Sequence, residues 1–167
     1  MQETLERVYL EHRQGLYTLA LAITRNPAAA EDAVQDAFAR LWGNPNRPEG
    51  NLVSYVFASV RNAALDQLRR RARAAAWLES ASIYSNLPED PAASLIDAEQ
   101  HHMVREAVDA LPDAEREAVV LRIYAGLSFD EMAQTLGEPL PTVASRYRRA
   151  LAKLGRVVKA VTEPYHE

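Results

Sequence analysis

The chain has 167 residues, of which 48% are hydrophobic and 25% are charged, and its formal net charge is −4 at pH 7. This composition is typical of a globular protein with an ordinary hydrophobic core, and the length suffices for one domain or two small ones. The absence of cysteine excludes disulfides, thiolate metal sites and iron–sulfur clusters.

The remaining composition argues against metal, membrane and catalytic functions. The spacing of His12, His101, His102 and His166 is not that of a metal site, so we expect neither a metal nor another cofactor. No apolar run approaches the roughly 20 residues that span a bilayer, and Met1 does not open a signal peptide. We therefore expect a cytoplasmic protein without membrane insertion. There is no glycine-rich phosphate loop and no nucleophile beside a base, so an enzyme is not expected.

The first half of the chain is predicted to form three helices, because its apolar residues recur at helical spacing. The first helix covers Leu5–Arg25, the second Ala28–Trp42 and the third Leu52–Arg73, with a loop at 43–50. We expect the apolar stripe of the second helix to lie in the core. The opposite face of that helix is either a solvated surface or a docking surface for a basic partner, and it carries Asp32, Gln35 and Asp36.

Helical periodicity fades after the third helix and returns near Leu95. Residues 76–121 contain two basic and ten acidic residues, and Leu87–Pro91 has the strongest linker composition. Four further helices are predicted, at Leu95–Leu111, Glu115–Tyr124, Ser128–Leu136 and about Thr142–Val161. The predicted fold is therefore all-α, with two small helical domains, 1–75 and 99–167, joined by an acidic linker at 76–98.

A helix-turn-helix is predicted near the end of the chain. Ser128 followed three residues later by Glu131 has the pattern of a capping box, and Gly137 suits a left-handed residue that ends a short helix. A short helix, a tight turn and a basic helix form the unit that places its second helix in a DNA major groove. An ordinary helical hairpin remains the alternative.

The last predicted helix is strongly basic. Between Pro141 and Val161 there are six basic residues and no acidic one, whereas a merely solvated face usually mixes both signs. We expect Val143, Tyr147, Ala150, Leu151 and Leu154 to face the core. The outward face supplies candidate base readers (Thr142, Ser145, Arg149) and candidate phosphate contacts (Arg146, Arg148, Lys153).

A second basic cluster lies at the end of the third predicted helix. Several guanidinium groups beside an amide suit a phosphate backbone with some base contact. The same cluster could instead be a favourable arrangement of charge at a helix C-terminus. The candidate DNA contacts are Asn62, Asp66, Arg69, Arg70 and Arg73, with Arg61 nearby.

Three parts of the chain resemble one protein family. Ala30–Trp42 resembles the core-polymerase-binding segment of bacterial sigma factors of the extracytoplasmic-function (ECF) class of the sigma-70 family. Val60–Arg71 resembles the promoter-melting and minus-ten-reading helix of that family. Leu111–Arg122, Leu127–Gly137 and Pro141–Arg146 are similar to its minus-thirty-five-reading domain. The matching segments occur in the family's order and span nearly the whole chain.

The resemblance implies a two-domain sigma factor that binds core RNA polymerase, recognises and opens promoter DNA, and is held inactive by an anti-sigma factor. It implies that the loop at 44–51 lies near flipped, unpaired bases, and that the acidic linker follows the nucleic-acid channel of the polymerase as a mimic of RNA. By position, it assigns polymerase contacts to Asp32, Gln35, Asp36, Phe38 and Trp42, and minus-ten contacts to Asn62, Asp66, Arg69 and Arg70.

The chain departs from the family pattern at three positions. Pro141 stands where glycine is common, Ala144 where lysine is common, and Tyr55 where tryptophan is usual. The second change removes one phosphate contact. A stand-alone helix-turn-helix regulator is the alternative function. The acidic net charge favours the sigma factor, because an acidic protein binds free DNA poorly and gains from a partner.

Overall fold

The computed structural model describes residues 4–44, 46, 49–75 and 95–162. All secondary-structure elements among the described residues are helices and none is a strand, which confirms the predicted all-α fold. The elements are α1 (Leu5–Thr24), α2 (Pro27–Gly43), α3 (Leu52–Ala75), α4 (Leu95–Asp109), α5 (Asp113–Val119), the π-helix η1 (Val120–Tyr124), α6 (Phe129–Leu136) and α7 (Leu140–Thr162). Most of the predicted linker, residues 76–94, lies outside the described residues, and residues 95–98 belong to α4.

Local signals set the ends of the first two helices. The side chain of Thr4 accepts a hydrogen bond from the backbone N–H of Arg7, at 3.2 Å, and so caps the start of α1. Arg25 ends α1 in the left-handed region, at φ 52°. Asn26 then caps α2 by accepting from the N–H of Ala29 at 2.9 Å, and Pro27 occupies the first turn, where its missing donor is harmless.

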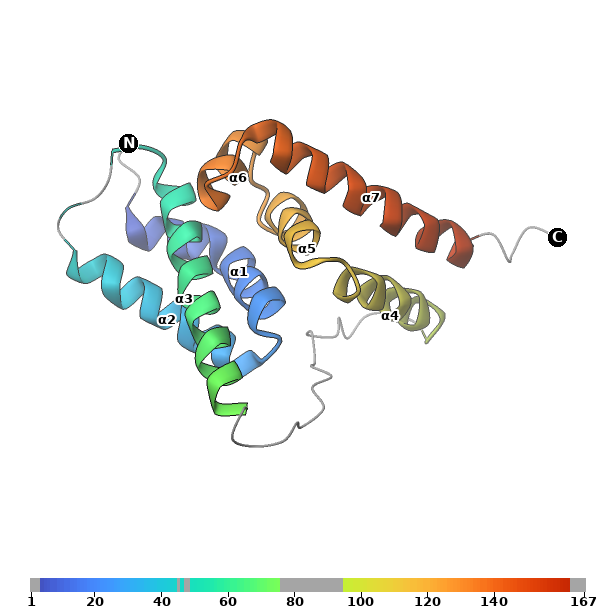
Figure 1. Ribbon diagram of the computed structural model, residues 1–167, viewed down its shortest axis with the longest axis horizontal. Coiled ribbons are helices and arrows are strands. Elements are labelled where there is room, and N and C mark those ends of the chain that lie inside the picture. Colours follow the sequence, from blue (N-terminus) through green and yellow to red (C-terminus); the bar gives the residue numbers. More distant parts are fainter. Residues whose placement is uncertain (1–3, 45, 47–48, 76–94, 163–167) are drawn as a thin grey trace.

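Helices α1, α2 and α3 pack together around one apolar core (Figure 1). Leu16, Leu19, Val56 and Phe57 are among its largest fully buried side chains. The predicted stripe of α2 is buried at every position except two: Val34 is half-buried and Trp42 is 62% exposed. The predicted core position of Trp42 is therefore wrong, because α2 ends one residue later and none of the described helices covers its last turn.

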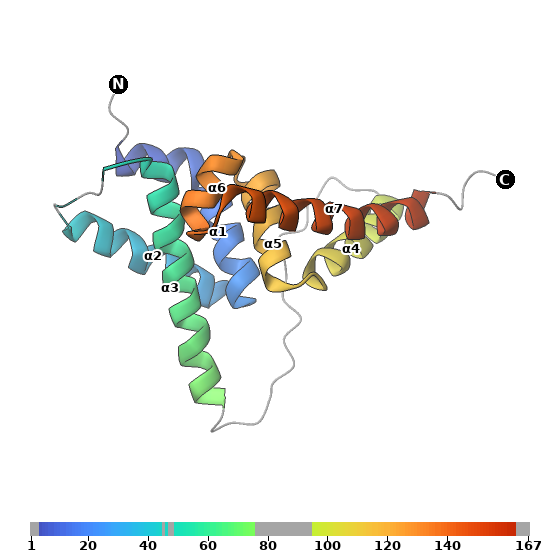
Figure 2. The same cartoon turned by 45° about the horizontal axis from the view of Figure 1, so that its top comes forward.

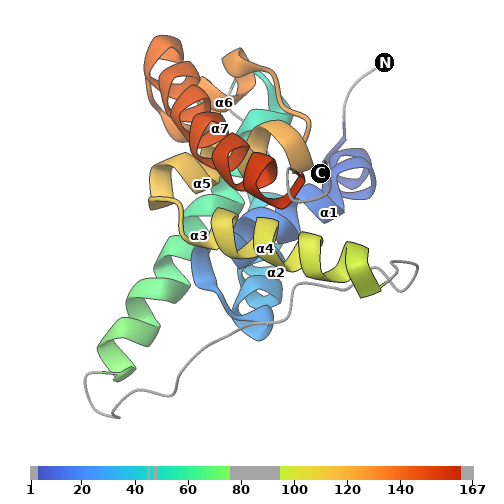
Figure 3. The same cartoon turned by 90° about the vertical axis from the view of Figure 1, so that its right-hand side faces the viewer.

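The C-terminal half is built from shorter helices that turn sharply. Predicted as one helix, 115–124 instead forms α5 followed by the π-helix η1, and the chain then turns at Gly126, which has φ 70°. The Arg122 guanidinium donates to the carbonyl of Leu127 at 2.8 Å and lies 5.2 Å from the centre of the Phe129 ring. These contacts fix the chain direction between η1 and α6. Helix α7 then runs outward beside α4 (Figures 2 and 3).

The two halves of the chain share one hydrophobic core. Leu121, Leu127 and Met132 belong to the same buried cluster as Phe57 of α3. Gly15 of α1 faces Ala125 so closely that an added Cβ would lie 2.9 Å from the Ala125 Cα, which leaves no room for a side chain. The sequence did not predict how the two halves of the chain are arranged relative to each other. The structure places α6 directly against α3.

Candidate nucleic-acid interface

Helices α6 and α7 form the predicted helix-turn-helix (Figure 1). The capping box is present: the N–H of Glu131 donates to the Ser128 hydroxyl at 3.2 Å, and the N–H of Ser128 donates to the Glu131 carboxylate at 2.8 Å. Gly137 ends α6 at φ 64° and donates to the carbonyl of Ala133. Pro141 lies in the first turn of α7, which tolerates proline.

Replacing Ser128 with alanine is expected to lower the free energy of unfolding by about 1 kcal/mol, because the backbone N–H of Glu131 at the start of α6 loses its acceptor. Urea denaturation measures this loss. The matched control is Ser59→Ala, since the Ser59 hydroxyl donates only to the carbonyl of Tyr55 in its own helix. Equal losses in the two variants would contradict the capping explanation.

The predicted DNA-contacting residues of α7 all reach the surface. Arg148, Arg149 and Lys153 are exposed, and Thr142, Ser145 and Arg146 are partly exposed. The helix packs inward through Val143 and Ala150, which are fully buried, and through the partly buried Tyr147 and Leu154.

Leu151 does not face the core as predicted. Its exposed fraction is 40%. The buried side of α7 follows positions 143, 147, 150 and 154, which recur at helical spacing, and Leu151 lies at the edge of this stripe. The prediction is wrong because an apolar residue next to a stripe was taken to belong to it.

Ion pairs hold some of the basic side chains of α7 and leave another unpaired. Glu115 of α5 is buried, and its carboxylate accepts from Lys153 Nζ at 2.7 Å and from Arg149 Nε at 3.4 Å. The Arg149 guanidinium also donates to the Ser145 hydroxyl at 3.2 Å. Arg148 makes no ion pair or hydrogen bond with any described residue. Glu115 thus fixes the direction of Arg149, whereas Arg148 is exposed to solvent.

The surroundings of Glu115 lower the pKa of its carboxyl group. The hydrogen bond from Lys153 is the largest cause; burial acts in the opposite direction, and the charges of Lys153 and Arg149 and the Arg149 hydrogen bond add to the lowering. A carboxyl group whose pKa is lower in the folded state stabilises the fold above its unfolded pKa, about 4.3. That stabilisation is lost as the pH falls through the lower, folded pKa.

The Glu115→Gln variant is therefore expected to lose about 1 kcal/mol of unfolding free energy at pH 7, because a charge-assisted contact becomes a neutral one. The difference between wild type and variant should shrink as the pH falls below about 4. Denaturant titrations at pH 7 and pH 3 measure it. The control is Glu138→Gln, whose pair with Arg146 at 3.1 Å is more exposed. A pH-independent difference for Glu115→Gln would contradict the assignment.

The predicted minus-ten contacts lie along the far end of α3. Asn62, Arg69, Arg70 and Arg73 are exposed, and Asp66 is half-buried. Asp66 accepts from Arg69 at 3.2 Å, one helical turn away. The end of α3 extends beyond α1 and α2, so these side chains are accessible (Figure 2).

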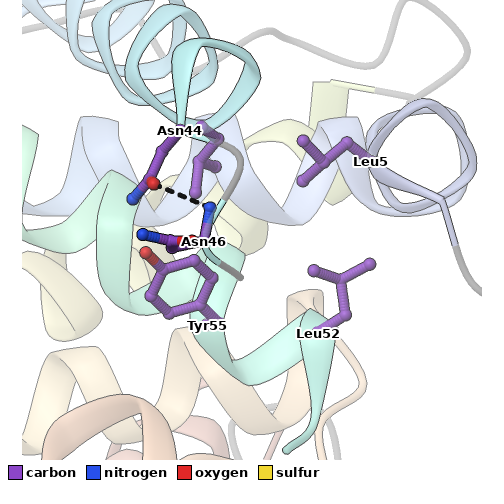
Figure 4. A pocket seen from close by; sticks show the side chains of 6 residues that line it. Leu5, Asn44, Asn46, Leu52 and Tyr55 are labelled. Atoms are coloured by element: carbon purple, nitrogen blue, oxygen red, sulfur yellow. Dashed lines mark hydrogen bonds between the residues drawn. The ribbon is translucent and has the colours of Figure 1, made fainter. Parts of the chain in front are cut away.

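A shallow pocket lies where the loop after α2 meets the start of α3. Asn44, Asn46 and Tyr55 supply its polar groups, and Leu5, Leu41 and Leu52 supply its apolar wall (Figure 4). The side chain of Asn44 accepts from the N–H of Asn46 at 3.0 Å and thereby shapes the loop. Amide groups can form hydrogen bonds with an unpaired base, and a neighbouring aromatic ring can stack on it.

Another surface is formed by α1 and α2. Tyr9, Phe38 and Trp42 form a row of rings, with centroids 5.1 Å apart for Tyr9 and Phe38 and 5.4 Å apart for Phe38 and Trp42. Phe38 is buried beneath the two outer rings. Of the predicted polymerase contacts on α2, Asp32 and Gln35 are exposed and Asp36 is half-buried. Exposed aromatic residues next to carboxylates are typical of a protein-docking surface.

The sequence did not single out three groups that shape these surfaces. Tyr9 was expected only as part of the first helix, and its position over Phe38 depends on how α1 crosses α2. Glu115 and Glu117 were counted among the acidic residues of a solvated region, and both are buried ion-pair partners. The one indication in the sequence is that α7 carries basic residues and no acidic one from 141 to 161, because such a surface attracts nearby carboxylates.

Neither a membrane-spanning helix nor a metal-ligand cluster occurs among the described residues. No helix there is long and apolar enough to cross a membrane. No group of three or more histidine, aspartate or glutamate side chains in the described ranges is arranged to hold a metal ion.

Comparisons with known proteins agree in both halves of the chain. Residues 8–74 match the family model of sigma-70 region 2, and residues 101–154 match that of sigma-70, region 4. The ECF RNA polymerase sigma factor SigK of Mycolicibacterium vanbaalenii is 30% identical over 161 residues, covering 90% of this chain and 81% of that protein. SigE of Mycolicibacterium smegmatis, also an ECF RNA polymerase sigma factor, is 34% identical and covers 86% of this chain and 57% of its own length.

A solved structure matches over the same extent. The sigma factor RpoE of Bartonella quintana, crystallised in complex with the anti-sigma factor NepR, has a TM-score of 0.74 and 26% sequence identity to this chain. The match covers 92% of this chain and 95% of that one. The likeness therefore includes both halves and not only the helix-turn-helix.

Proposed function

Because this chain belongs to the extracytoplasmic-function class of sigma-70 factors, we propose that each surface described above has its own role in promoter-specific initiation. One binds core RNA polymerase, one reads the minus-ten element and one reads the minus-thirty-five element. Sigma factors bind core RNA polymerase and direct it to promoters. The chain contributes binding and positioning and no chemistry of its own, and it acts in the cytoplasm, where transcription takes place. Supporting this division, the family-model ranges agree with the proposed domains 1–75 and 99–167.

The aromatic row and carboxylates of α1 and α2 are proposed to bind core RNA polymerase. The exposed Trp42 offers an apolar anchor, and Asp32, Gln35 and Asp36 on the same helix suit a basic partner surface. These features support the assignment that the resemblance made by position.

Helix α3 and the pocket at its start are proposed to read the minus-ten element. Arg69, Arg70 and Arg73 supply positive charge for the phosphates, and Asn62 supplies an amide for a base edge. The side chains of Asn44, Asn46 and Tyr55, which lie together beside the loop, are proposed to contact an unpaired base.

Helix α7 is proposed to read the minus-thirty-five element. Its cationic surface, which includes no acid from 141 to 161, is the observation that carries the proposal. Thr142, Ser145 and Arg149 are proposed to read base edges, and the hydrogen bond between Ser145 and Arg149 supports a shared role for these two side chains. Arg146, Arg148 and Lys153 are proposed as phosphate contacts.

Control by an anti-sigma factor is also proposed. The support is the match, at 26% identity over both halves, to a sigma factor whose structure was determined with its anti-sigma factor. The partner of the present chain would bind surfaces that polymerase or DNA also needs.

Run-off transcription with purified core RNA polymerase on a pool of genomic fragments tests the proposed function. The expected result is a small set of transcripts that appear only when the chain and core enzyme are both present. A chain that shifts duplex DNA unaided and gives no transcripts with core enzyme would contradict it.

A further inference from the structure

One buried carboxylate contacts two basic side chains of α7. Glu115 lies in the first turn of α5, which packs against α7 (Figure 1). Its Oε2 accepts from Lys153 Nζ at 2.7 Å, and its Oε1 accepts from Arg149 Nε at 3.4 Å. Lys153 follows Arg149 by one helical turn, so both side chains reach the same carboxylate. Glu115 therefore links α5 to two neighbouring positions of α7.

The backbone that carries Glu115 is itself held firmly by the next residue, Arg116. The Arg116 side chain is buried and donates to the carbonyls of Asp109 at 3.0 Å and Leu111 at 2.9 Å, where α4 ends. Leu111 also belongs to the buried apolar cluster that contains Ala150 of α7. The start of α5 is thus fixed to both α4 and α7, and Glu115 projects from a rigid support.

Arg149 is held at two points although its side chain is 57% exposed. Besides the contact of its Nε with Glu115, its Nη1 donates to the Ser145 hydroxyl at 3.2 Å. These two bonds use only some of the N–H donors of the guanidinium, so the others remain for a ligand. A guanidinium recognises a base edge by two parallel hydrogen bonds, which requires a defined orientation. The two internal bonds supply that orientation before DNA binds.

Glu115 has no direct access to DNA. Its side chain is only 8% exposed, so it can influence a ligand only through the cations that it holds. Glu138, in the turn before α7, pairs with Arg146 at 3.1 Å and has a side chain that is 38% exposed. The two acids therefore hold residues of different proposed roles, a base reader for Glu115 and a phosphate contact for Glu138.

We propose that Glu115 is a positioning residue for minus-thirty-five recognition, which holds Arg149 in the orientation that reads one base pair and shares its carboxylate with Lys153. This inference rests on the proposed function, because it assumes that α7 reads the minus-thirty-five element. A side chain that is already oriented loses less conformational freedom when it binds. A released Arg149 would instead sample other directions and reach phosphates beside any sequence.

Lys153 has a different part in this arrangement. Its hydrogen bond is the main cause of the lowered pKa of Glu115, so it helps to keep the buried carboxylate ionised. An ammonium group has three donors, and the remaining ones can still contact a phosphate. Removing Lys153 should therefore weaken binding to every sequence but leave Glu115 paired with Arg149. Removing the Glu115 charge should instead release Arg149 and lower discrimination.

Holoenzyme binding to a series of promoters tests the proposal. Each base pair of the minus-thirty-five element is replaced in turn in a promoter recovered by run-off transcription, and fluorescence anisotropy measures every affinity at one salt concentration. Arg149→Ala should lower discrimination at one base pair by about fivefold or more. Glu115→Gln should lower discrimination at that same base pair by about threefold and leave the other positions unchanged.

A double variant shows whether Glu115 acts through Arg149. Adding Glu115→Gln to Arg149→Ala should lower discrimination no further, because the side chain that Glu115 orients is already absent. Glu115→Asp retains the charge but is shorter by one methylene, and the contact with Arg149 is already 3.4 Å long. It should therefore also lose discrimination at the same base pair.

Two controls separate orientation from packing. Glu138→Gln removes the other acid that pairs with α7 and should keep the wild-type pattern of discrimination. Lys153→Met breaks the shorter of the two contacts between Glu115 and α7, so it loosens α5 from α7 without releasing Arg149. It should weaken binding to all the promoters alike. Circular dichroism of the full-length variants checks that each one is folded.

The outcomes distinguish the positioning role from the proposed function. Wild-type discrimination by both Glu115 variants would overturn the positioning role and leave the sigma-factor activity standing. The same loss of discrimination in Lys153→Met as in Glu115→Gln would also overturn it, because loosened packing would then explain both. So would additive losses in the double variant with Arg149→Ala. Absence of transcripts from the wild-type holoenzyme would instead overturn the proposed function.

Discussion

Replacement of Trp42 with alanine is expected to weaken binding to core RNA polymerase by about 2–4 kcal/mol, the cost typical of an aromatic hot spot. Trp42 is 62% exposed, yet its ring rests on Phe38, so the free protein already holds it in one orientation. A preorganised apolar anchor loses little side-chain entropy on binding. Because the side chain is mostly in solvent, its removal should barely change folding stability.

Fluorescence titration of labelled core enzyme with the variant measures this effect without DNA. The matched control is Met103→Ala, which removes another exposed apolar side chain, 44% exposed, from α4. Asp36→Arg adds a second test on α2, because reversing the charge beside the aromatic row should also impair assembly. If Trp42→Ala binds core RNA polymerase as tightly as wild type, the assignment of the polymerase contact to α1 and α2 is contradicted.

The sequence predicted the helices well because each one carries its own local signals. The apolar spacing of α1, α2 and α3 and the Ser128–Glu131 capping box depend only on neighbouring residues. The predicted and observed ends of these helices agree within two residues. The π-helix was missed because its wider hydrogen-bond pattern leaves no distinct periodicity over only five residues.

Contacts between distant segments could not be predicted in the same way. Glu115 and Glu117 have the composition of surface residues and become buried only because cationic side chains from α7 and α3 neutralise them. The Thr135 hydroxyl donates to the backbone carbonyl of Ser54 across 81 residues, and nothing near either residue in the sequence indicates this contact. Trp42 shows the converse case, in which an apolar residue in a helical stripe stays exposed.

The proposed recognition surface of α7 can be divided by two substitutions with different expected outcomes. Arg149→Ala should cost about 1–3 kcal/mol in discrimination between a cognate and a mutated minus-thirty-five element, if its guanidinium reads a base edge. Arg148→Ala should weaken binding to all sequences alike and reduce the salt slope of binding by about 1, as expected for a phosphate contact. The measurement is holoenzyme binding to both promoters at several salt concentrations.

The pairing of Arg149 with Glu115 makes this test sharper. If Glu115 orients the guanidinium toward the DNA, Glu115→Gln should reduce discrimination in the same direction as Arg149→Ala, while Glu138→Gln should not. If the pair only holds α5 against α7, Arg149→Ala should lower folding stability and leave discrimination unchanged. The base-reading assignment thus depends on whether discrimination between the two promoters changes, because only a base contact predicts that change.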